Sequence, residues 1–473
     1  MRERLAGRPV KRLVRFVVVA CLCGPAGAIA QTAPTGPLTL NDAVQTALKN
    51  YPAIRERRAR AQAADEGVGV AKTAYLPRLD MLWQENRATT NNVFGLLLPQ
   101  GVVPPISGPV LGTRSYDGVW GSAAGVLLSW DAVDFGQRKA SVDVARAQSS
   151  LAKAQTALAE LDVAAAAADA FLSVLAADES VRAARANVDR LQVFADAVRT
   201  LVRNQLRPGA DESRADAELA IARNQLSQAV QVADVARASL ADAIGTAGAS
   251  IELSAGALGT VPEVAVGPLA PASHPAAQAG QAGVDAVLAR ERALDRAYFP
   301  QLILQSAFAG RGTGADVPGQ ASLGSGVWPQ VANWAVGASI TFPAFELFSV
   351  NARKRVERQN EIAERARYDQ TVQTLTTQDA RARALMKAAA EIARNTPVER
   401  QAATDAESRA RARYQNGLAS ITEVAEAQRL LAQAEADDAL ARLGVWRALL
   451  AAAQTRGDLG PFLAQTAKPA TEE

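Results

Sequence analysis

Apolar residues recur three and four positions apart along a long stretch in the first half of the chain. The recurring positions are Val181, Ala184, Val188, Leu191, Ala195, Val198 and Val202. This spacing is typical of a coiled-coil seam, and its small residues allow two helices to approach closely. We predict long helices over 137–206 and 349–415, each followed by a shorter helix, over 210–244 and 418–455. A helix of about seventy residues spans about 100 Å, which is longer than a compact domain requires.

Between the helical stretches, apolar residues alternate with small or polar ones at the period of two that is typical of β-strands. In one such stretch Trp334 and Val336 share one face, and Gly337 and Ser339 share the other. The stretch 116–130 has the same pattern. Segments of about ten residues with an apolar outer face and aromatic ends are typical of membrane β-barrel strands. The residues predicted to face lipid are Trp120, Trp130, Trp334, Val336 and Ile340. A half-buried strand of a soluble sheet is the alternative.

The mature chain is a tandem duplication. The segments that begin NYPAIRER and SHPAAQAG each place two prolines 25 residues apart, and they end in AYLPRL and AYFPQL. Further along, SWDAVDFGQRKA resembles TFPAFELFSVNA, and the turn at Pro208-Gly209 is aligned with Asn416-Gly417. These matches occur in the same order with a period of about 210 residues, which is far longer than the period of solenoid repeats.

The duplication predicts the domain organisation. The first repeat, 31–245, contains helices from about 40 to 74, a strand hairpin over 78–131 and a helical hairpin over 137–244. The second repeat, 274–457, contains a helix over about 276–297, a strand hairpin over 300–343 and a helical hairpin over 349–455. The connector 246–273 is rich in Gly, Ala and Pro. The C-terminal tail, 458–473, is expected to be flexible.

The first thirty residues predict export. A basic segment, a short apolar run and the small-residue site at Ala28-Ile29-Ala30 indicate a secretory signal peptide over 1–30. The alternative is a lipoprotein box ending at Cys21. The chain has a formal net charge of +3, and the segment holds six basic residues and one acidic residue, so its removal leaves a slightly acidic protein. That balance argues against nucleic acid as a partner. Both cysteines, Cys21 and Cys23, leave with the segment.

Candidate catalytic and metal-binding chemistry is sparse. The single histidine, His274, precedes Pro275 and is expected at the surface or at a helix entry, because one histidine does not make a metal site. The segment GRGTGAD at 310–316 does not open into a helix as a dinucleotide-binding loop does, so we expect a hairpin loop there. We predict that the protein is not an enzyme and has no catalytic residues, no metal site and no cofactor.

The segment RYQNGLASITEVAEAQ at 413–428 contains a turn between two helices, followed by two glutamates. Glu423 and Glu426 are three residues apart and share a helix face, opposite the apolar stripe that includes Val424. In an isolated helix this is a solvated face, whereas in an oligomeric tube it can line the lumen. The two aligned turns, each between a long and a shorter helix, are interpreted as hairpin tips.

The strands predict an oligomer. Four strands cannot close a barrel, and an open sheet edge cannot face lipid. No stretch beyond the first thirty residues has the roughly 18 apolar residues of a membrane helix, so a membrane passage would use strands. Three chains would supply a twelve-stranded barrel.

Taken in order, these motifs resemble the TolC-like outer-membrane efflux channel family over nearly all of the mature chain. LTLNDAVQTALKNYP is similar to its opening segment, YLPRL and YFPQL to its strand entries, and RYQNGLASITEVAEAQ to its second hairpin tip. The resemblance implies a mostly α protein with membrane β-structure. It implies a homotrimeric twelve-stranded β-barrel, with four strands per chain, in outer-membrane lipid. The barrel would continue into a long α-helical coiled-coil tunnel across the periplasm.

The resemblance also implies a function and partners. The channel would be a passive conduit of a tripartite efflux or type I secretion system for small molecules such as drugs, metals or other toxic compounds. It would receive them from a periplasmic adaptor (membrane fusion protein) and an inner-membrane pump of the RND, ABC or MFS type. The adaptor would dock on the hairpin tips, at Pro208, Gly209, Ala210, Asn416, Gly417 and Leu418.

The family's entrance implies specific gate residues. Glu423 and Glu426 stand where an acidic selectivity ring is expected, Tyr414 matches a gate-locking tyrosine, and Asp216 is its expected acidic partner, one position out of register. Ala419 stands where the family has an arginine that completes the lock. One alternative to a channel is a periplasmic coiled-coil scaffold or adaptor without a membrane barrel, and another is a secreted enzyme.

Overall fold

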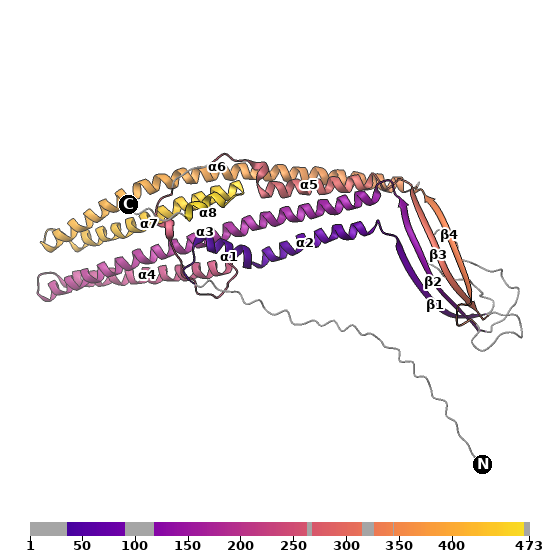
Figure 1. Ribbon diagram of the computed structural model, residues 1–473. Coiled ribbons are helices and arrows are strands. Elements are labelled where there is room, and N and C mark those ends of the chain that lie inside the picture. The colour runs from indigo at the N-terminus through magenta and orange to yellow at the C-terminus, as the bar shows by residue number, and fades with distance from the viewer. Residues whose placement is uncertain (1–35, 90–117, 263–266, 315–325, 344, 468–473) are drawn as a thin grey trace, which may run out of the picture.

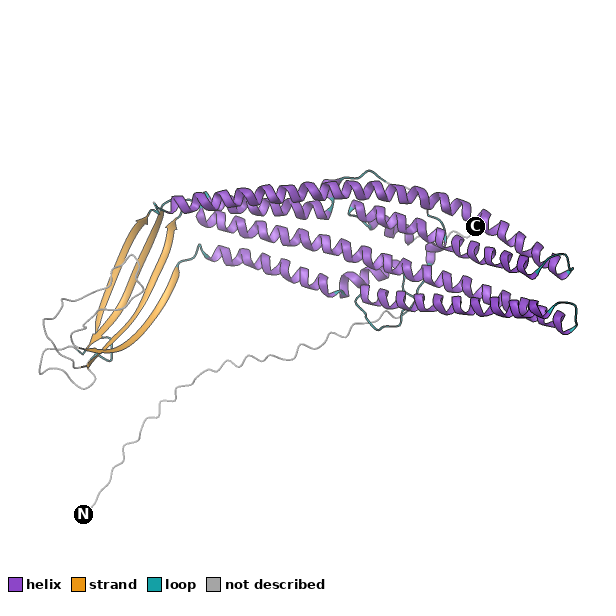
Figure 2. Cartoon of the chain, turned by 180° about the vertical axis from the view of Figure 1, so that it is seen from behind, coloured by secondary structure: helices purple, strands orange, loops and turns teal. Residues whose placement is uncertain are grey.

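The computed structural model describes residues 36–89, 118–262, 267–314, 326–343 and 345–467. The predicted signal peptide and the alternative lipidation at Cys21 lie outside these residues. The described chain is an elongated molecule with a β-sheet at one end and two helical hairpin tips at the other (Figures 1 and 2). The helices are α1 Leu40–Asn50, α2 Pro52–Thr73, α3 Gln137–Arg203, α4 Gly209–Ala243, α5 Pro275–Leu294, α6 Glu346–Gln415, α7 Ile421–Arg456 and α8 Gly460–Thr466. The predicted mostly helical class is confirmed.

The sheet has four antiparallel strands in chain order. They are β1 Arg78–Thr89, β2 Gly118–Val133, β3 Gln301–Thr313 and β4 Val331–Thr341. Strand β2 pairs with β3, with Val126 opposite Phe308, so the two repeats meet inside one sheet. β1 and β4 form the two edges within the described residues. Helices α2 and α5 precede β1 and β3, and the long helices α3 and α6 follow β2 and β4, so all four strands adjoin the helices at the same end of the sheet (Figure 1).

Helix α3 is the central element of the helical part. It packs against α4 in the first hairpin, lies between α2 and α5 nearer the sheet, and also contacts α1 and α7. Its buried face is rich in alanine, with Ala164, Ala165, Ala167 and Ala168 all buried. Small side chains let the helix axes approach closely. No helix among the described residues is long and apolar enough to cross a membrane.

The main hydrophobic core lies midway along the helices. Phe171 and Leu172 of α3 and Trp446 of α7 are almost completely buried there, together with Ile244 at the end of α4. The Trp446 indole nitrogen donates a hydrogen bond of 2.9 Å to the carbonyl oxygen of Thr260 in the connector. The connector is also tied to the N-terminal segment by a bridge between Leu38 and Leu253. The two repeats are therefore joined in this core as well as in the sheet.

The C-terminal segment corrects one prediction. A flexible tail was expected from 458 onwards, but residues 460–466 form α8. Phe462 is only 3% exposed and its ring packs edge-on against Trp446 at a centroid distance of 6.1 Å. The aromatic contact and its burial outweigh the loss of chain entropy that favours a free terminus. The short apolar pair Phe462-Leu463 is too local a signal for the sequence to indicate this docking.

His274 begins α5 and is buried, with 5% of its surface exposed. Its Nδ1 accepts a hydrogen bond of 3.0 Å from the Ala276 amide, and its Nε2 lies 3.1 Å from the carbonyl oxygen of Gln454. Gly457 ends α7 beside it with φ of +77°, and a side chain at Gly457 would collide with Pro275. The helix-entry interpretation of His274 is confirmed, and the residue is not at the surface.

Candidate functional site at the hairpin tips

Both long helices end in the same hydrogen-bonded turn. At the end of α6, the Gly417 amide donates to the Tyr414 carbonyl oxygen at 3.0 Å and the Leu418 amide donates to the Arg413 carbonyl oxygen at 2.8 Å. Gly417 has a φ of +77°. This left-handed residue with its two backbone bonds is a Schellman C-cap, and it satisfies helix carbonyls that would otherwise lack donors.

The first hairpin repeats this turn with glutamine in the left-handed position. Gln205 has a φ of +58°, its amide donates to the Val202 carbonyl oxygen, and the Leu206 amide donates to the Leu201 carbonyl oxygen, both at 2.9 Å. Asn204 and Asn416 also repeat each other, because each side-chain amide donates to the carbonyl oxygen four residues back, at 2.9 and 2.8 Å.

These turns correct the alignment of the two tips. Asn204-Gln205-Leu206 corresponds to Asn416-Gly417-Leu418, whereas the sequence comparison aligned Pro208-Gly209 with Asn416-Gly417. Pro208 is instead the N-cap of α4, and Gly209 is its first residue. The glycine was a misleading anchor, since glutamine adopts the left-handed conformation here at a modest steric cost. Counted from the left-handed residue, Arg207 corresponds to Ala419 and Asp211 corresponds to Glu423.

Tyr414 lies at the centre of a buried cluster that joins the two tips. It is 1% exposed, and its hydroxyl donates a hydrogen bond of 3.0 Å to the Asp211 carboxylate on α4. The Arg207 guanidinium lies 4.3 Å from the centroid of the Tyr414 ring and also donates to the Tyr414 carbonyl oxygen. The ring of Phe194 in α3 packs against the Tyr414 ring, with their centroids 5.6 Å apart. Contacts from α3, the first tip and α4 thus all converge on one residue of α6.

The environment of Tyr414 keeps its phenol protonated. The pKa of Tyr414 is raised to about 12, and burial is the largest cause. The hydrogen bond to Asp211 and the negative charge of Asp211 also raise the pKa, while the positive charge of Arg207 lowers it. An ionised phenolate would lose the hydrogen bond to Asp211 and repel its carboxylate.

Asp216 does not contact Tyr414 in this chain, so the predicted partner is wrong within one protomer. The Asp216 carboxylate accepts a bond of 2.5 Å from Arg199 of α3, inside its own hairpin. Asp216 lies more than one helical turn beyond Asp211 along α4, which carries it away from the level of Tyr414.

Glu423 and Glu426 are exposed on the first turns of α7. Glu423 forms a capping box with Ser420: its backbone amide donates to the serine oxygen and its carboxylate accepts from the serine amide, both at 3.3 Å. It also lies 3.8 Å from the Arg413 guanidinium, and Glu426 is paired with Arg429. Glu423 therefore contributes to the start of α7 as well as carrying charge.

The apolar core under the tips holds both hairpins together. Leu191, Ala195 and Val198 of α3 pack with Leu219 of α4 and with Val424 of α7. On the side of this core away from the tips, the Arg190 guanidinium of α3 donates two hydrogen bonds to the Glu435 carboxylate of α7, at 3.1 and 2.8 Å. The part of the predicted seam at Leu191, Ala195 and Val198 is therefore buried, in a contact between hairpins as well as within one.

At the other end of the molecule, the five residues predicted to face lipid lie on one exposed face of the sheet. Their exposed fractions are 41% for Trp120, 40% for Trp130, 77% for Trp334, 74% for Val336 and 73% for Ile340. Strand pairing extends this face into a row across all four strands, formed by Met81, Val126, Phe308 and Trp334.

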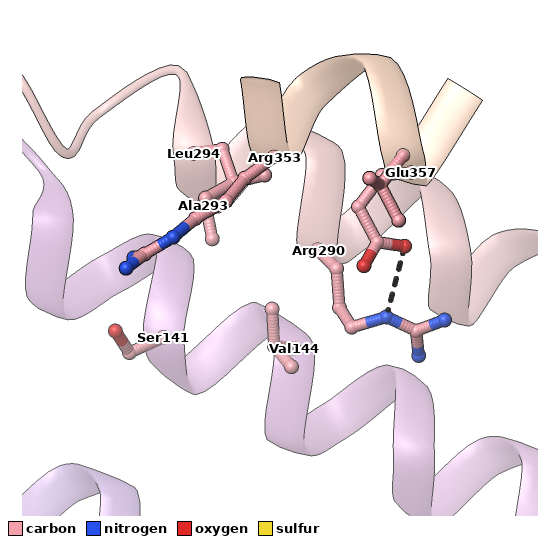
Figure 3. A pocket seen from close by; sticks show the side chains of 8 residues that line it. Ser141, Val144, Arg290, Ala293, Leu294, Arg353 and Glu357 are labelled. Atoms are coloured by element: carbon pink, nitrogen blue, oxygen red, sulfur yellow. Dashed lines mark hydrogen bonds and ion pairs between the residues drawn. The ribbon is translucent and has the colours of Figure 1, made fainter. Parts of the chain in front are cut away.

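A pocket of about 470 Å³ lies between α3, α5 and α6 near the sheet (Figure 3). Arg290 is bonded to Glu357 at 3.3 Å, while Arg353 points away from Glu357. The remaining lining is mainly aliphatic, including Val144, Leu294 and Val356. Among the described residues, no group of three or more His, Cys, Asp or Glu is placed to hold a metal ion.

The sequence profile of the Outer membrane efflux protein family matches residues 43–246 and 266–457. The chain belongs to the outer membrane efflux protein family. As an outer membrane efflux protein it resides in the outer membrane and extends into the periplasm. A search of curated proteins finds no match.

Solved structures of outer-membrane channels share this fold. OprN is 21% identical with a TM-score of 0.69, over 88% of this chain and 89% of that one. CmeC of Campylobacter jejuni is 15% identical with a TM-score of 0.72, over 92% of this chain and 87% of that one. MtrE of Neisseria gonorrhoeae is 19% identical with a TM-score of 0.69, over 92% of this chain and 91% of that one.

Sequence reasoning missed Arg207, Asp211 and Phe194. The repeated Asn-x-Leu at 204–206 and 416–418 was the available signal. It aligns Gln205 with Gly417, so that Asp211 and Glu423 each stand six residues after the left-handed residue. The glycine at 209 concealed it.

The phenol of Tyr414 predicts a stability change at alkaline pH. Folding raises this pKa from 10.0 to about 12. The protonated phenol therefore makes its full contribution to the free energy of unfolding below pH 10, and this contribution is lost as the pH rises towards 12. Tyrosinate absorbance of the wild type minus that of Tyr414→Phe should therefore show one tyrosine that titrates well above the ordinary range. A difference curve centred near pH 10 would contradict the buried hydrogen bond to Asp211.

Proposed function

We propose that the protein is the trimeric outer-membrane channel of a tripartite efflux or secretion system, a passive conduit for small molecules. The observation that carries the proposal is the sheet, which combines an exposed apolar face with two edge strands. An unpaired edge in hydrocarbon leaves backbone amides and carbonyls without partners, at a cost of several kcal/mol for each group. Pairing of β4 with β1 of the next chain removes this cost, and three chains close a twelve-stranded barrel.

The helical part supports the same proposal. The long helices continue directly from the strands, so a closed ring of strands would continue into a ring of helices that ends at the hairpin tips (Figure 2). A periplasmic adaptor would dock at the tips and receive substrate from an inner-membrane pump. The left-handed turns place Leu206 and Leu418 at equivalent positions, 67% and 70% exposed, which makes Asn204–Leu206 and Asn416–Leu418 the proposed docking segments.

Assembly is the first test. In mild detergent the purified protein should have the mass of three chains and should migrate differently on gels before and after heating. In planar bilayers it should form ion-conducting pores. A monomer that is soluble without detergent would support the periplasmic scaffold or adaptor instead.

Charge on the exposed face should block insertion. Val336→Lys would place an ammonium in the proposed lipid face, at about 2–4 kcal/mol if it lies near the midplane. Ser339→Lys would place the same charge on the opposite face of β4 and should reduce the yield less. The yield of heat-modifiable trimer from membranes measures both. Equal loss in the two variants would reject the proposed orientation of the sheet.

Glu423 and Glu426 should set the ion selectivity of the channel. Three chains would bring six carboxylates, from Glu423 and Glu426, into one confined ring that attracts cations. The double change Glu423→Gln and Glu426→Gln removes the charge while the glutamine at 423 can still complete the capping box with Ser420. Reversal potentials in a salt gradient should show lower cation selectivity, and block by multivalent cations from the tip side should weaken. Unchanged selectivity with normal trimer yield would leave these residues as a solvated surface.

A further inference from the structure

The cavity between α3, α5 and α6 is built from matching positions of the two repeats. Ser141 and Val144 of α3 line it, and so do Arg353 and Val356 of α6, while α5 packs against both of these helices. The sequence match between SWDAVDFGQRKA and TFPAFELFSVNA, continued by four residues, aligns Ser141 with Arg353 and Val144 with Val356. The duplication therefore gives the cavity two similar walls, and they differ by one charge.

The charges that line the cavity do not cancel. The Glu357 carboxylate accepts hydrogen bonds from Arg290 and from Asn360, both at 3.3 Å, so the charge of Arg290 is matched. Arg353 forms no hydrogen bond or ion pair within the described part of the chain. Its side chain extends away from Glu357, towards the α3 side of the cavity (Figure 3). One guanidinium thus remains available to a ligand.

The rest of the lining is apolar and is only partly covered by the protein. Val144, Ala293 and Leu294 are half-buried, and Val356 is exposed. The volume of about 470 Å³ is within the range of roughly 300–1,000 Å³ that is usual for small-molecule pockets. A ring system or a short chain fits this volume, whereas a lipid with two long chains would leave most of them outside. An apolar wall beside one free cation is complementary to a small amphiphilic anion.

We propose that this cavity binds a small amphiphilic anion, an aromatic or short-chain carboxylate or sulfonate. The anionic group pairs with Arg353, whose planar guanidinium can donate to two oxygens of one acid group. The apolar part of the ligand lies against Val144, Leu294 and Val356 and is removed from water. The binding site stands on the cavity alone, and only its use by molecules in transit rests on the proposed channel function.

The test is calorimetric titration of the full-length protein, in nanodiscs of zwitterionic phosphatidylcholine, with naphthalene-2-sulfonate. After subtraction of empty nanodiscs, the wild type should show saturable binding of one molecule per chain. Arg353→Gln should raise the dissociation constant by roughly tenfold, because a charge-assisted contact is lost. The uncharged naphthalene-2-sulfonamide should bind the wild type more weakly and should not respond to this change. Val144→Trp, which fills the cavity with an indole, should abolish binding of both compounds.

Arg355→Gln is the matched control. Arg355 is an exposed residue of α6 that does not line the cavity, and within the described residues it forms no hydrogen bond or ion pair. Residues two positions apart on a helix do not share a face, so this variant should bind the sulfonate as the wild type does. An equal loss of affinity in Arg353→Gln and Arg355→Gln would indicate a general attraction to a basic helix and would reject the site.

Anionic phosphatidylglycerol in the nanodisc distinguishes a small ligand from a lipid headgroup. General repulsion by this lipid should weaken binding to the wild type and to Arg353→Gln by the same factor. A loss confined to the wild type would mean that a headgroup occupies Arg353, and it would overturn the proposal. Absence of saturable binding to the wild type would do the same. A wild type that binds the sulfonate but forms no pores in planar bilayers would instead reject the channel function and leave the site standing.

Discussion

Close packing along α3 is the constraint on which the rest of the structure depends. Its alanine-rich buried face, with Ala164, Ala165, Ala167 and Ala168, brings neighbouring helices near enough to share one core. Each small side chain buries little area by itself, so the stability of such a helix comes from contact repeated over its whole length. Because α3 contacts helices of both repeats, the same packing also aligns the two hairpins and sets the level at which their tips meet.

The tips show how a repeated backbone can carry different chemistry. Gln205 and Gly417 occupy the same left-handed C-cap, with the same two backbone bonds and the same asparagine before them. The side chains that follow then diverge. The first tip has Arg207 and Asp211, which both form hydrogen bonds with Tyr414. The second tip has Ala419 and Glu423 at the equivalent positions, and Glu423 takes part in the capping box of α7. One turn therefore supplies the contacts between hairpins, and the other supplies an exposed charge.

The sheet has the opposite balance of surface and core. Its apolar row of Met81, Val126, Phe308 and Trp334 lies on the more exposed face, and small residues such as Ala123 and Ala309 are buried on the other face. In water this arrangement exposes a large apolar patch, which in soluble proteins usually marks an interaction surface. The helical part of the same chain keeps its aromatic residues, such as Trp446 and Phe171, inside.

The sequence by itself determined the mostly helical class, the alternation of the strands and the places where the chain repeats, because periods of two and of three to four are local properties of the residues. The exposed positions of Trp334, Val336 and Ile340 follow from that alternation. The tertiary structure alone decided that α8 docks through Phe462 on Trp446, that Gln205 rather than Gly209 is the left-handed residue, and that Tyr414 meets Asp211 and Arg207 rather than Asp216. The Tyr414 contacts join residues about 200 positions apart in the sequence. The docking of α8 depends on how the core around Trp446 is packed, and the left-handed turn depends on a backbone conformation that several residue types can adopt. The left-handed residue lies four positions before the glycine that the sequence suggested, which changes the side chains that are expected to meet, and local patterns do not fix that position.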